Sequence, residues 1–403
     1  MPQPSRIQPG ELGRFLPERG LCWISACSAE SSLFAQKLAG LHRPGLTFTS
    51  IFVAGLNRPS CLMQTGARIV TFFMLPEFAE SDRVTFLPIC YRDIRAWLKA
   101  NPPASALVMV SPPDADGICS FGPVNDFIAD IWESIPTLIA HINPAVPVTE
   151  GTPGIPFERL SGFIEAEQAL PTTDSGMDDV SARIAALAAE HVPDGATLQA
   201  GLGRAPEAVL RALVHRRDLA IHSGLIGDST LHLLNSGALR AHNPITAGVA
   251  IGTKALYDAV SRPEFRFRPP SFTHDIATLA GIDRLVTINS AIEVDLDGQA
   301  HAEATTSGFI SGPGGASDFA AGARGLDGLR IVVLPSTAAR GQISRIVATR
   351  DATGPVSLGR FDTDLVITEH GVADLRGKSA YDRRAALVAV ADPVYRPRLM
   401  QVE

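Results

Sequence analysis

The chain has few cysteines and no paired arrangement of them. Its 403 residues contain five, all in the first third and none in a Cys-x-x-Cys motif: Cys22, Cys27, Cys61, Cys90 and Cys119. An odd number of cysteines argues against a disulfide framework, and the lack of a metal-ligand spacing argues against a zinc site. We therefore expect free thiols and no metal. The chain also lacks an apolar run near the ~20 residues of a membrane helix, and its N-terminus lacks an apolar signal core. We therefore expect a cytoplasmic protein without membrane contact.

Lysine is scarce as well, although arginine is not. The net charge is −7 and only four residues are lysine, and no basic stripe is present, which argues against nucleic acid as a partner. Hydrophobic residues make up 45% of the chain and charged residues 19%, a balance typical of a large folded core. The length fits two domains of ordinary size.

Strand and helix patterns alternate through the first half of the chain. Helices are expected at 94–100 and 124–132, and strands at 21–26, 46–53, 68–73, 106–110 and 137–142. This alternation predicts an α/β fold with a mostly parallel sheet. A polar break at 171–176 is interpreted as a linker, which gives a first domain at 1–175 and a second at 176–403, the latter opening with a helix at 178–190.

The most informative stretch runs from Gln199 to Ser229. A short strand at 197–200 is followed by the small-residue turn 201–203, a helix opened by Pro206, and a second strand at 219–222 that is expected to end at Ser223-Gly224. The free backbone N–H groups of such a turn suit an anion or the polar chain of a ligand. A similar strand, turn and helix begins at Leu21, which indicates a duplicated α/β unit.

Several dense motifs carry a family resemblance. They are Leu198-Gln199-x-Gly201-x-Gly203-x-x-Pro206, Leu219-x-Ile221-His222-Ser223, Asn289-Ser290-Ala291-x-Glu293-Val294-Asp295 and Ser311-Gly312-x-Gly314-Gly315-x-x-Asp318-Phe319. Together they resemble the acetyl-CoA hydrolase/CoA-transferase family, in its class I, 4-hydroxybutyrate CoA-transferase-like form. The resemblance implies two similar open-sheet α/β domains of the CoA-transferase type, coenzyme A or acyl-CoA as substrate, and a homo-oligomer.

Two positions depart from the family pattern. Gly224 stands where the family carries its nucleophilic glutamate, and Thr273-His274-Asp275 stands where the family usually has Thr-Asn-Asp. In the family, the glutamate attacks the acyl-CoA thioester and later carries CoA as a glutamyl thioester. Because Gly224 has no side chain, that first step cannot use this position here.

Three interpretations of Gly224 stay open. In the first, an amine, an alcohol or water takes the acyl group directly, with His222 as the base and with extra room beside Gly224. In the second, another carboxylate replaces the missing one: Glu293 first, then Asp295 and Glu303. Strand alternation places Glu293 and Asp295 on one face. In the third, the chain binds a CoA ligand without catalysis.

The resemblance also implies the residues that contact CoA: Gly201, Leu202, Gly203, Arg204 and Ala205 as the main loop, with Ala291, Ser311 and Gly315 as further contacts. Gly314 and Gly315 suit a close backbone approach and the donors of an oxyanion site. The turn only weakly resembles a dinucleotide fingerprint, because its third glycine is absent, so NAD is not expected.

Overall fold

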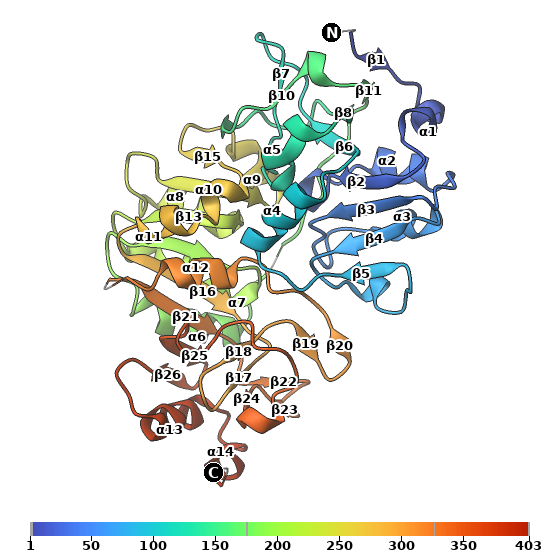
Figure 1. Cartoon of the computed structure of the whole chain (residues 1–403). Helices are drawn as coiled ribbons and strands as arrows, with labels where there is room; N and C mark the ends of the chain where they lie inside the picture. The colour runs from blue at the N-terminus through green and yellow to red at the C-terminus, as the bar shows by residue number, and fades with distance from the viewer. Residues whose placement is uncertain (1–2, 175, 326, 402–403) are drawn as a thin grey trace. The chain divides into compact units, whose positions relative to one another are not determined.

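The computed structural model describes residues 3–174, 176–325 and 327–401. The chain forms two compact units (Figure 1): Met1–Thr173 with Thr246–Thr273, and Asp174–Ile245 with His274–Glu403. This division differs from the continuous domains 1–175 and 176–403, because the segment Thr246–Thr273 packs with the first unit. Residue 175, the last of the predicted first domain, lies outside the described residues.

The first unit is built on an eight-stranded sheet whose neighbouring strands all pair in parallel. The order is β1 (Ser5–Arg6), β11 (Gly162–Glu165), β8 (Thr137–Ile142), β6 (Ser105–Val110), β2 (Gly20–Ile24), β3 (Leu46–Ser50), β4 (Arg68–Thr71) and β5 (Val84–Phe86). The five predicted strands are confirmed within a few residues, and the predicted parallel sheet with them.

Helices and short strands complete the first unit. The helices are α1 (Leu12–Phe15), α2 (Ser32–Leu38), α3 (Ser60–Gln64), α4 (Tyr91–Ala100), α5 (Phe127–Ile131), α9 (Lys254–Ala259) and α10 (Pro270–Thr273). The short strands are β7 (Ile118–Cys119), β9 (Glu150–Gly151), β10 (Ile155–Pro156) and β15 (Phe265–Phe267), and β14 (Ile245–Ala250) leads back into this unit.

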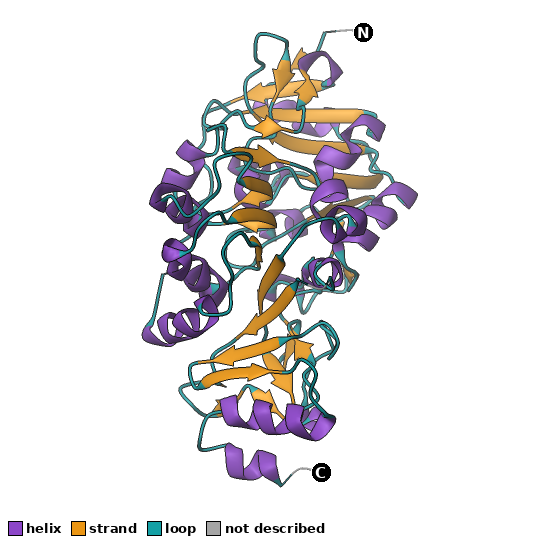
Figure 2. Cartoon of the chain, turned by 90° about the vertical axis from the view of Figure 1, so that its left-hand side faces the viewer, coloured by secondary structure: helices purple, strands orange, loops and turns teal. Residues whose placement is uncertain are grey.

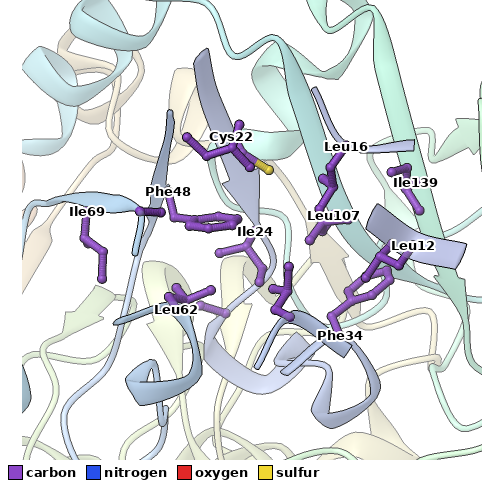
Figure 3. Close-up of a cluster of buried hydrophobic side chains, with 14 of the residues drawn as sticks. Leu12, Leu16, Cys22, Ile24, Phe34, Phe48, Leu62, Ile69, Leu107 and Ile139 are labelled. Carbon is purple, nitrogen blue, oxygen red and sulfur yellow. The ribbon is translucent and has the colours of Figure 1, made fainter. Parts of the chain in front are cut away.

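Helical side chains pack on one face of this sheet (Figure 3). Phe34 of α2 and Leu62 of α3 lie among strand residues that include Phe48, Ile69 and Leu107. Burying each such side chain contributes about 1.5–3 kcal/mol, so this cluster holds the helices to the sheet. The five cysteines are free thiols, as expected. Burial raises the pKa of Cys22 to about 12.

The second unit contains a six-strand run in the order β26 (Gly371–Asp374), β25 (Leu365–Thr368), β21 (Leu329–Val333), β16 (Leu285–Ser290), β12 (Thr197–Ala200) and β13 (Ala220–Ile226). Its helices are α6 (Asp179–Ala189), α7 (Arg204–Ala212), α8 (Asp228–Ser236), α11 (Ile276–Ala280), α12 (Ala316–Gly322), α13 (Ala380–Val390) and α14 (Arg396–Met400). Helix α13 lies against β25 and β26 through Leu387 and Val388 (Figure 1). Figure 2 shows the resulting mixture of helices and strands.

Small strand pairs follow the main sheet of this unit. The strands β18 (Ala300–His301), β17 (Glu293–Asp295) and β24 (Ile346–Val347) form a three-stranded sheet. The strands β19 (Ala304–Thr305) and β20 (Gly308–Phe309) form a hairpin, and so do β22 (Thr337–Ala338) and β23 (Ile343–Ser344). Within the described ranges, no helix combines the length and the apolar character that crossing a membrane requires.

The two main sheets share a strand order around their first long strand. In the first unit β2 lies between β3 and β6, and in the second β12 lies between β13 and β16. In each case the next strand of the chain lies on one side and a later strand on the other, so the order reverses there. This correspondence supports the predicted duplication. It also places a topological switch point, the usual ligand position in an open α/β sheet, at the carboxyl end of β12.

Candidate functional site

The turn after β12 lies at this switch point. Gly201 donates its N–H to the Ile288 carbonyl of β16 at 2.9 Å, and Gly203 has φ of 126°, a conformation that favours glycine. Helix α7 then begins at Arg204, with Pro206 in its first turn. Its apolar side packs into the unit through the buried residues Val209, Leu210 and Leu213.

The end of β16 lies beside this turn. The Ser290 hydroxyl donates to the Leu202 carbonyl at 3.2 Å. One strand position earlier, the side-chain amides of Gln199 and Asn289 pair at 3.1 and 3.2 Å. The structure thus brings Ala291, which follows Ser290, to the same place as the predicted loop. The Leu202 side chain is 51% exposed, so the outer surface of the turn is open to a ligand.

The last two residues of the predicted loop begin α7. The Arg204 guanidinium forms an ion pair with Asp178 at 2.6 Å. The Ser181 N–H and this guanidinium lower the pKa of Asp178 to about 2. Ala205 is buried. The Arg204 charge is therefore already partnered within the unit.

Strand β13 carries His222 and Gly224, and it is longer than predicted. The expected end at Ser223-Gly224 is wrong, since the strand continues to Ile226. The extended backbone tolerates glycine, and the Ser223 hydroxyl ties the strand to the Ala200 carbonyl at 3.2 Å. The register pairs Leu198 of β12 with Ile221, and the Ser223 hydroxyl bonds to Ala200, the last residue of β12. Gly224, where the family resemblance leads us to expect the nucleophile, thus follows this contact directly and lies near the start of the predicted CoA loop.

The space beside Gly224 is filled by an imidazole. A Cβ atom built on Gly224 would lie 2.5 Å from Cε1 and 2.7 Å from Nε2 of His274, whereas ordinary contacts are 3.4–4 Å. A Cβ on Gly315 would likewise lie 2.5 Å from Cδ2 of the same ring. The prediction of extra room beside Gly224 is therefore wrong, because His274 occupies that room.

Phe319 of α12 completes this group. The centroid of its ring lies 4.8 Å from that of the His274 ring and 6.4 Å from that of the His222 ring, and both pairs have edge-on geometry. His222 and Gly224 are two residues apart on β13, so they face the same side of the sheet. Burial, and then the proximity of His222, lowers the pKa of His274 to about 3. At neutral pH the His274 ring is therefore uncharged.

Two of the three candidate surrogate carboxylates, Glu293 and Asp295, lie on β17, and Glu303 lies between β18 and β19. Glu293 of β17 accepts a hydrogen bond from the Thr353 N–H. Asp295, on the same face of β17, contacts His301 at 3.4 Å. Burial acts to raise the pKa of Asp295, but hydrogen bonds from His301 and Gln299 lower it overall. Glu303 accepts from the Ser357 hydroxyl at 2.8 Å. Each carboxylate thus has a local structural partner, and the role of Glu293 as a surrogate nucleophile stays a prediction.

The remaining predicted contacts precede α12. Ser311 donates its N–H to the Glu303 carbonyl at 3.2 Å, and Gly314 has φ of 61°. Gly315 is the N-cap residue of α12. Its α-carbon packs against the His274 ring, on the side where a Cβ atom would collide with that ring. Of the predicted residues, the structure therefore groups Gly315 with Gly224 and His222, and it groups Ala291 with the loop at 201–205. Sequence reasoning did not assign a function to His274 or Phe319, although the departure at position 274 was its visible signal.

Comparison with known proteins agrees with the motifs. The family model for the acetyl-CoA hydrolase/transferase C-terminal domain matches residues 252–402. A 4-hydroxybutyrate coenzyme A transferase of Clostridium kluyveri is 35% identical over 331 residues, which cover 79% of this chain and 77% of that protein.

Solved structures show the same fold. The crystal structure of 4-hydroxybutyrate CoA-transferase from Porphyromonas gingivalis superposes with a TM-score of 0.82 at 28% identity, over 98% of this chain and 96% of that one. RipA from Yersinia pestis superposes with a TM-score of 0.89 at 24% identity, with the same coverage. The chain therefore belongs to the acetyl-CoA hydrolase/CoA-transferase family and has the α/β fold of its members.

Proposed function

We propose that this enzyme processes acyl-CoA thioesters without a glutamyl-CoA intermediate. The acyl group would pass from sulfur directly to an amine, an alcohol or water. The observation that carries this proposal is the pairing of Gly224 with His274. The position that the family pattern gives to a nucleophilic glutamate has no side chain here, and the neighbouring imidazole fills the space that a side chain would enter.

His222 is the proposed base. It lies two residues before Gly224 on the same face of β13, and its ring packs edge-on near Phe319. Histidine is the side chain whose unperturbed titration lies closest to neutral pH. In the proposed step, His222 takes the proton of the acceptor as the acceptor attacks the thioester carbon. The carbon–sulfur bond then breaks, and the imidazolium returns the proton to the CoA thiolate, so the charges balance.

The turn at 201–205 is the proposed holder of the CoA chain, with Ala291, Ser311, Gly314 and Gly315 as further contacts. The turn lies at the switch point of the sheet, where ligands of open α/β folds bind. Its outer residue Leu202 is exposed. Gly224 follows Ser223, whose hydroxyl bonds to the Ala200 carbonyl just before this turn, so a thioester held by the turn would lie near His222 and His274.

The test combines two readings on the purified full chain. The protein is incubated with acetyl-, propionyl-, butyryl- and succinyl-CoA, with and without added amines or alcohols, and free CoA is measured with a thiol reagent. In parallel, intact and peptide mass spectrometry looks for CoA bound to protein. The matched control is Glu293→Gln, whose side chain retains an oxygen that accepts the Thr353 N–H.

Each outcome selects one mechanism. Release of CoA without a protein adduct supports direct transfer. An added amine or alcohol speeds this release if it is the acceptor, and leaves the rate unchanged if water is the acceptor. A CoA adduct on the peptide that contains Glu293, lost in Glu293→Gln, would instead establish a CoA-transferase with a surrogate carboxylate. Saturable CoA binding with no release and no adduct would establish a binding protein.

A further inference from the structure

We propose that His274 is a second catalytic residue of this site, and that its imidazole N–H donates a hydrogen bond to the thioester carbonyl oxygen and stabilises the oxyanion that forms there. The proposal rests on the proposed function, because it requires an acyl-CoA thioester beside β13. It assigns to His274 a role that differs from that of the base, His222.

The position of the ring is the first argument. Its outer edge, made of Cε1, Nε2 and Cδ2, faces two glycines from separate segments: Gly224 of β13 and Gly315 at the start of α12. A Cβ atom at either glycine would approach the ring to 2.5 Å or less. The two glycines and the histidine therefore form one packing unit, in which only glycine allows the imidazole to lie where it does.

The position of Nε2 also supports the proposal. This atom lies 2.7 Å from the point at which a side chain of residue 224 would begin. In the family pattern that side chain is the nucleophile, which must approach the thioester carbonyl. Nε2 of His274 thus lies close to the point at which the family's nucleophilic side chain would begin. It has the reach of one hydrogen bond, ~2.7–3.2 Å.

The charge state is the third argument. His274 is 5% exposed, and burial together with the proximity of His222 lowers its pKa to about 3. A ring with so low a pKa is a poor base near pH 7, since an efficient base titrates near the working pH. The uncharged imidazole still has one N–H group, and a buried, prearranged donor stabilises an oxyanion effectively. The two histidines therefore have different roles: His222 transfers the proton, and His274 donates a hydrogen bond to the carbonyl oxygen.

Phe319 supports this arrangement. Its ring packs at 4.8 Å against the His274 ring and so limits the rotation of the imidazole. Phe319 is thus a positioning residue.

The first experiment compares two variants of His274. In His274→Met a flexible apolar side chain fills the space without a donor, and in His274→Gln an amide N–H replaces the imidazole N–H. Steady-state CoA release should show that His274→Met loses kcat by roughly 10²–10³-fold, the effect of removing one oxyanion donor, while KM changes less than threefold. His274→Gln should retain more activity than His274→Met by at least tenfold. The matched control is His242→Gln, a change at an exposed histidine, and it should match the wild type.

The second experiment observes the wild-type ring directly and uses a variant only to assign its resonance. In the wild type labelled with ¹⁵N-histidine, the His274 ring should stay uncharged from pH 5.5 to 8.5. Its resonances should shift when acetyldethia-CoA is added, an analogue in which a methylene group replaces the thioester sulfur. The resonance is assigned by its absence from His274→Gln.

The outcomes separate this proposal from the proposed function. If the wild type releases CoA but His274→Met keeps kcat within threefold, the donor role is overturned and direct transfer stands. The same conclusion follows if the His274 resonances do not shift when the analogue is added. A His274 ring that titrates between pH 6 and 7 also overturns it. If the wild type releases no CoA from any of the four thioesters, the proposed function fails and the donor role fails with it.

Discussion

Replacing Gly224 by alanine tests whether the imidazole of His274 occupies the space of the missing side chain. The new methyl carbon would lie 2.5 and 2.7 Å from two atoms of the ring, closer than an ordinary contact by roughly 1 Å. The ring cannot simply retreat, because Gly315 and Phe319 pack against it. Overpacking of this kind costs about 1–3 kcal/mol, so we expect Gly224→Ala to destabilise the second unit by that amount.

The second member of the pair makes the test specific. His274→Asn shortens the side chain and leaves space beside residue 224, so the double variant Gly224→Ala/His274→Asn should be more stable than the sum of the two single changes predicts. Residues in direct contact couple by about 0.5–3 kcal/mol. Gly40→Ala is the control, because a Cβ atom there meets nothing within 4 Å.

The assay must report on the second unit. All three tryptophans, Trp23, Trp97 and Trp132, lie in the first unit, so their fluorescence would follow the wrong part of the chain. Hydrogen-exchange mass spectrometry of a peptide that spans β13 gives the opening free energy directly. A Gly224→Ala variant as stable as the wild type within about 0.5 kcal/mol, or single effects that add within that error, would refute the packing argument.

Four further predictions follow from the same structure. His222→Gln should lower kcat for CoA release by about 10²–10⁴-fold, because it removes the proposed base; an unchanged kcat contradicts that role. Gly224→Glu/His274→Asn, which restores the family residues at both positions, should acquire a CoA adduct at residue 224 by peptide mass spectrometry, whereas Gly224→Glu alone should not; equal adducts in both would show that His274 does not block this position. Glu293→Gln should keep kcat within threefold, since its carboxylate already binds the Thr353 N–H. The first unit should lose stability as the pH rises from about 4 to about 7: burial raises the pKa of Asp126 to about 7, so the folded state holds a proton that the unfolded chain releases. That loss, at most about 4 kcal/mol, should be smaller in Asp126→Asn; urea unfolding followed by tryptophan fluorescence measures it, and equal slopes would contradict the shift.

Local sequence patterns predicted the central strands of the fold well. The strand at 137–142 matches β8 to the residue, because a strand of a parallel sheet is buried on both faces and forms a continuous apolar run. Strands such as β11 and β5, with four and three residues, are too short for a recognisable period. The packing of Thr246–Thr273 with the first unit depends on contacts far apart in the sequence, and no local pattern contains that information.

The candidate site was predicted in its parts but not in its central contact. The motifs singled out the turn at 201–203, His222 and Gly224, which the structure places after β12 and on the neighbouring strand β13. The departure at His274 was visible in the sequence as well. Sequence alone did not reveal that these two departures are neighbours in space, because they lie on either side of a segment that belongs to the other unit. This contact explains both departures together: the His274 imidazole fits when residue 224 is glycine, and it does not fit when residue 224 is larger.

The turn after β12 and its counterpart after β2 differ in the protein groups that surround them. The corresponding backbone in the first unit, at Cys27, is closed by protein groups: Cys27 donates its N–H to Asn57 Oδ1 at 3.0 Å, and Asn57 Nδ2 donates to the Cys27 carbonyl at 2.9 Å. Cys27 is buried, whereas Leu202 in the second unit is 51% exposed. The same strand order therefore produces two switch points, of which one is filled by an asparagine side chain and the other has an exposed turn residue. The proposed site lies in the second unit, so we expect substitutions at Asn57 to lower the stability of the first unit without changing the release of CoA.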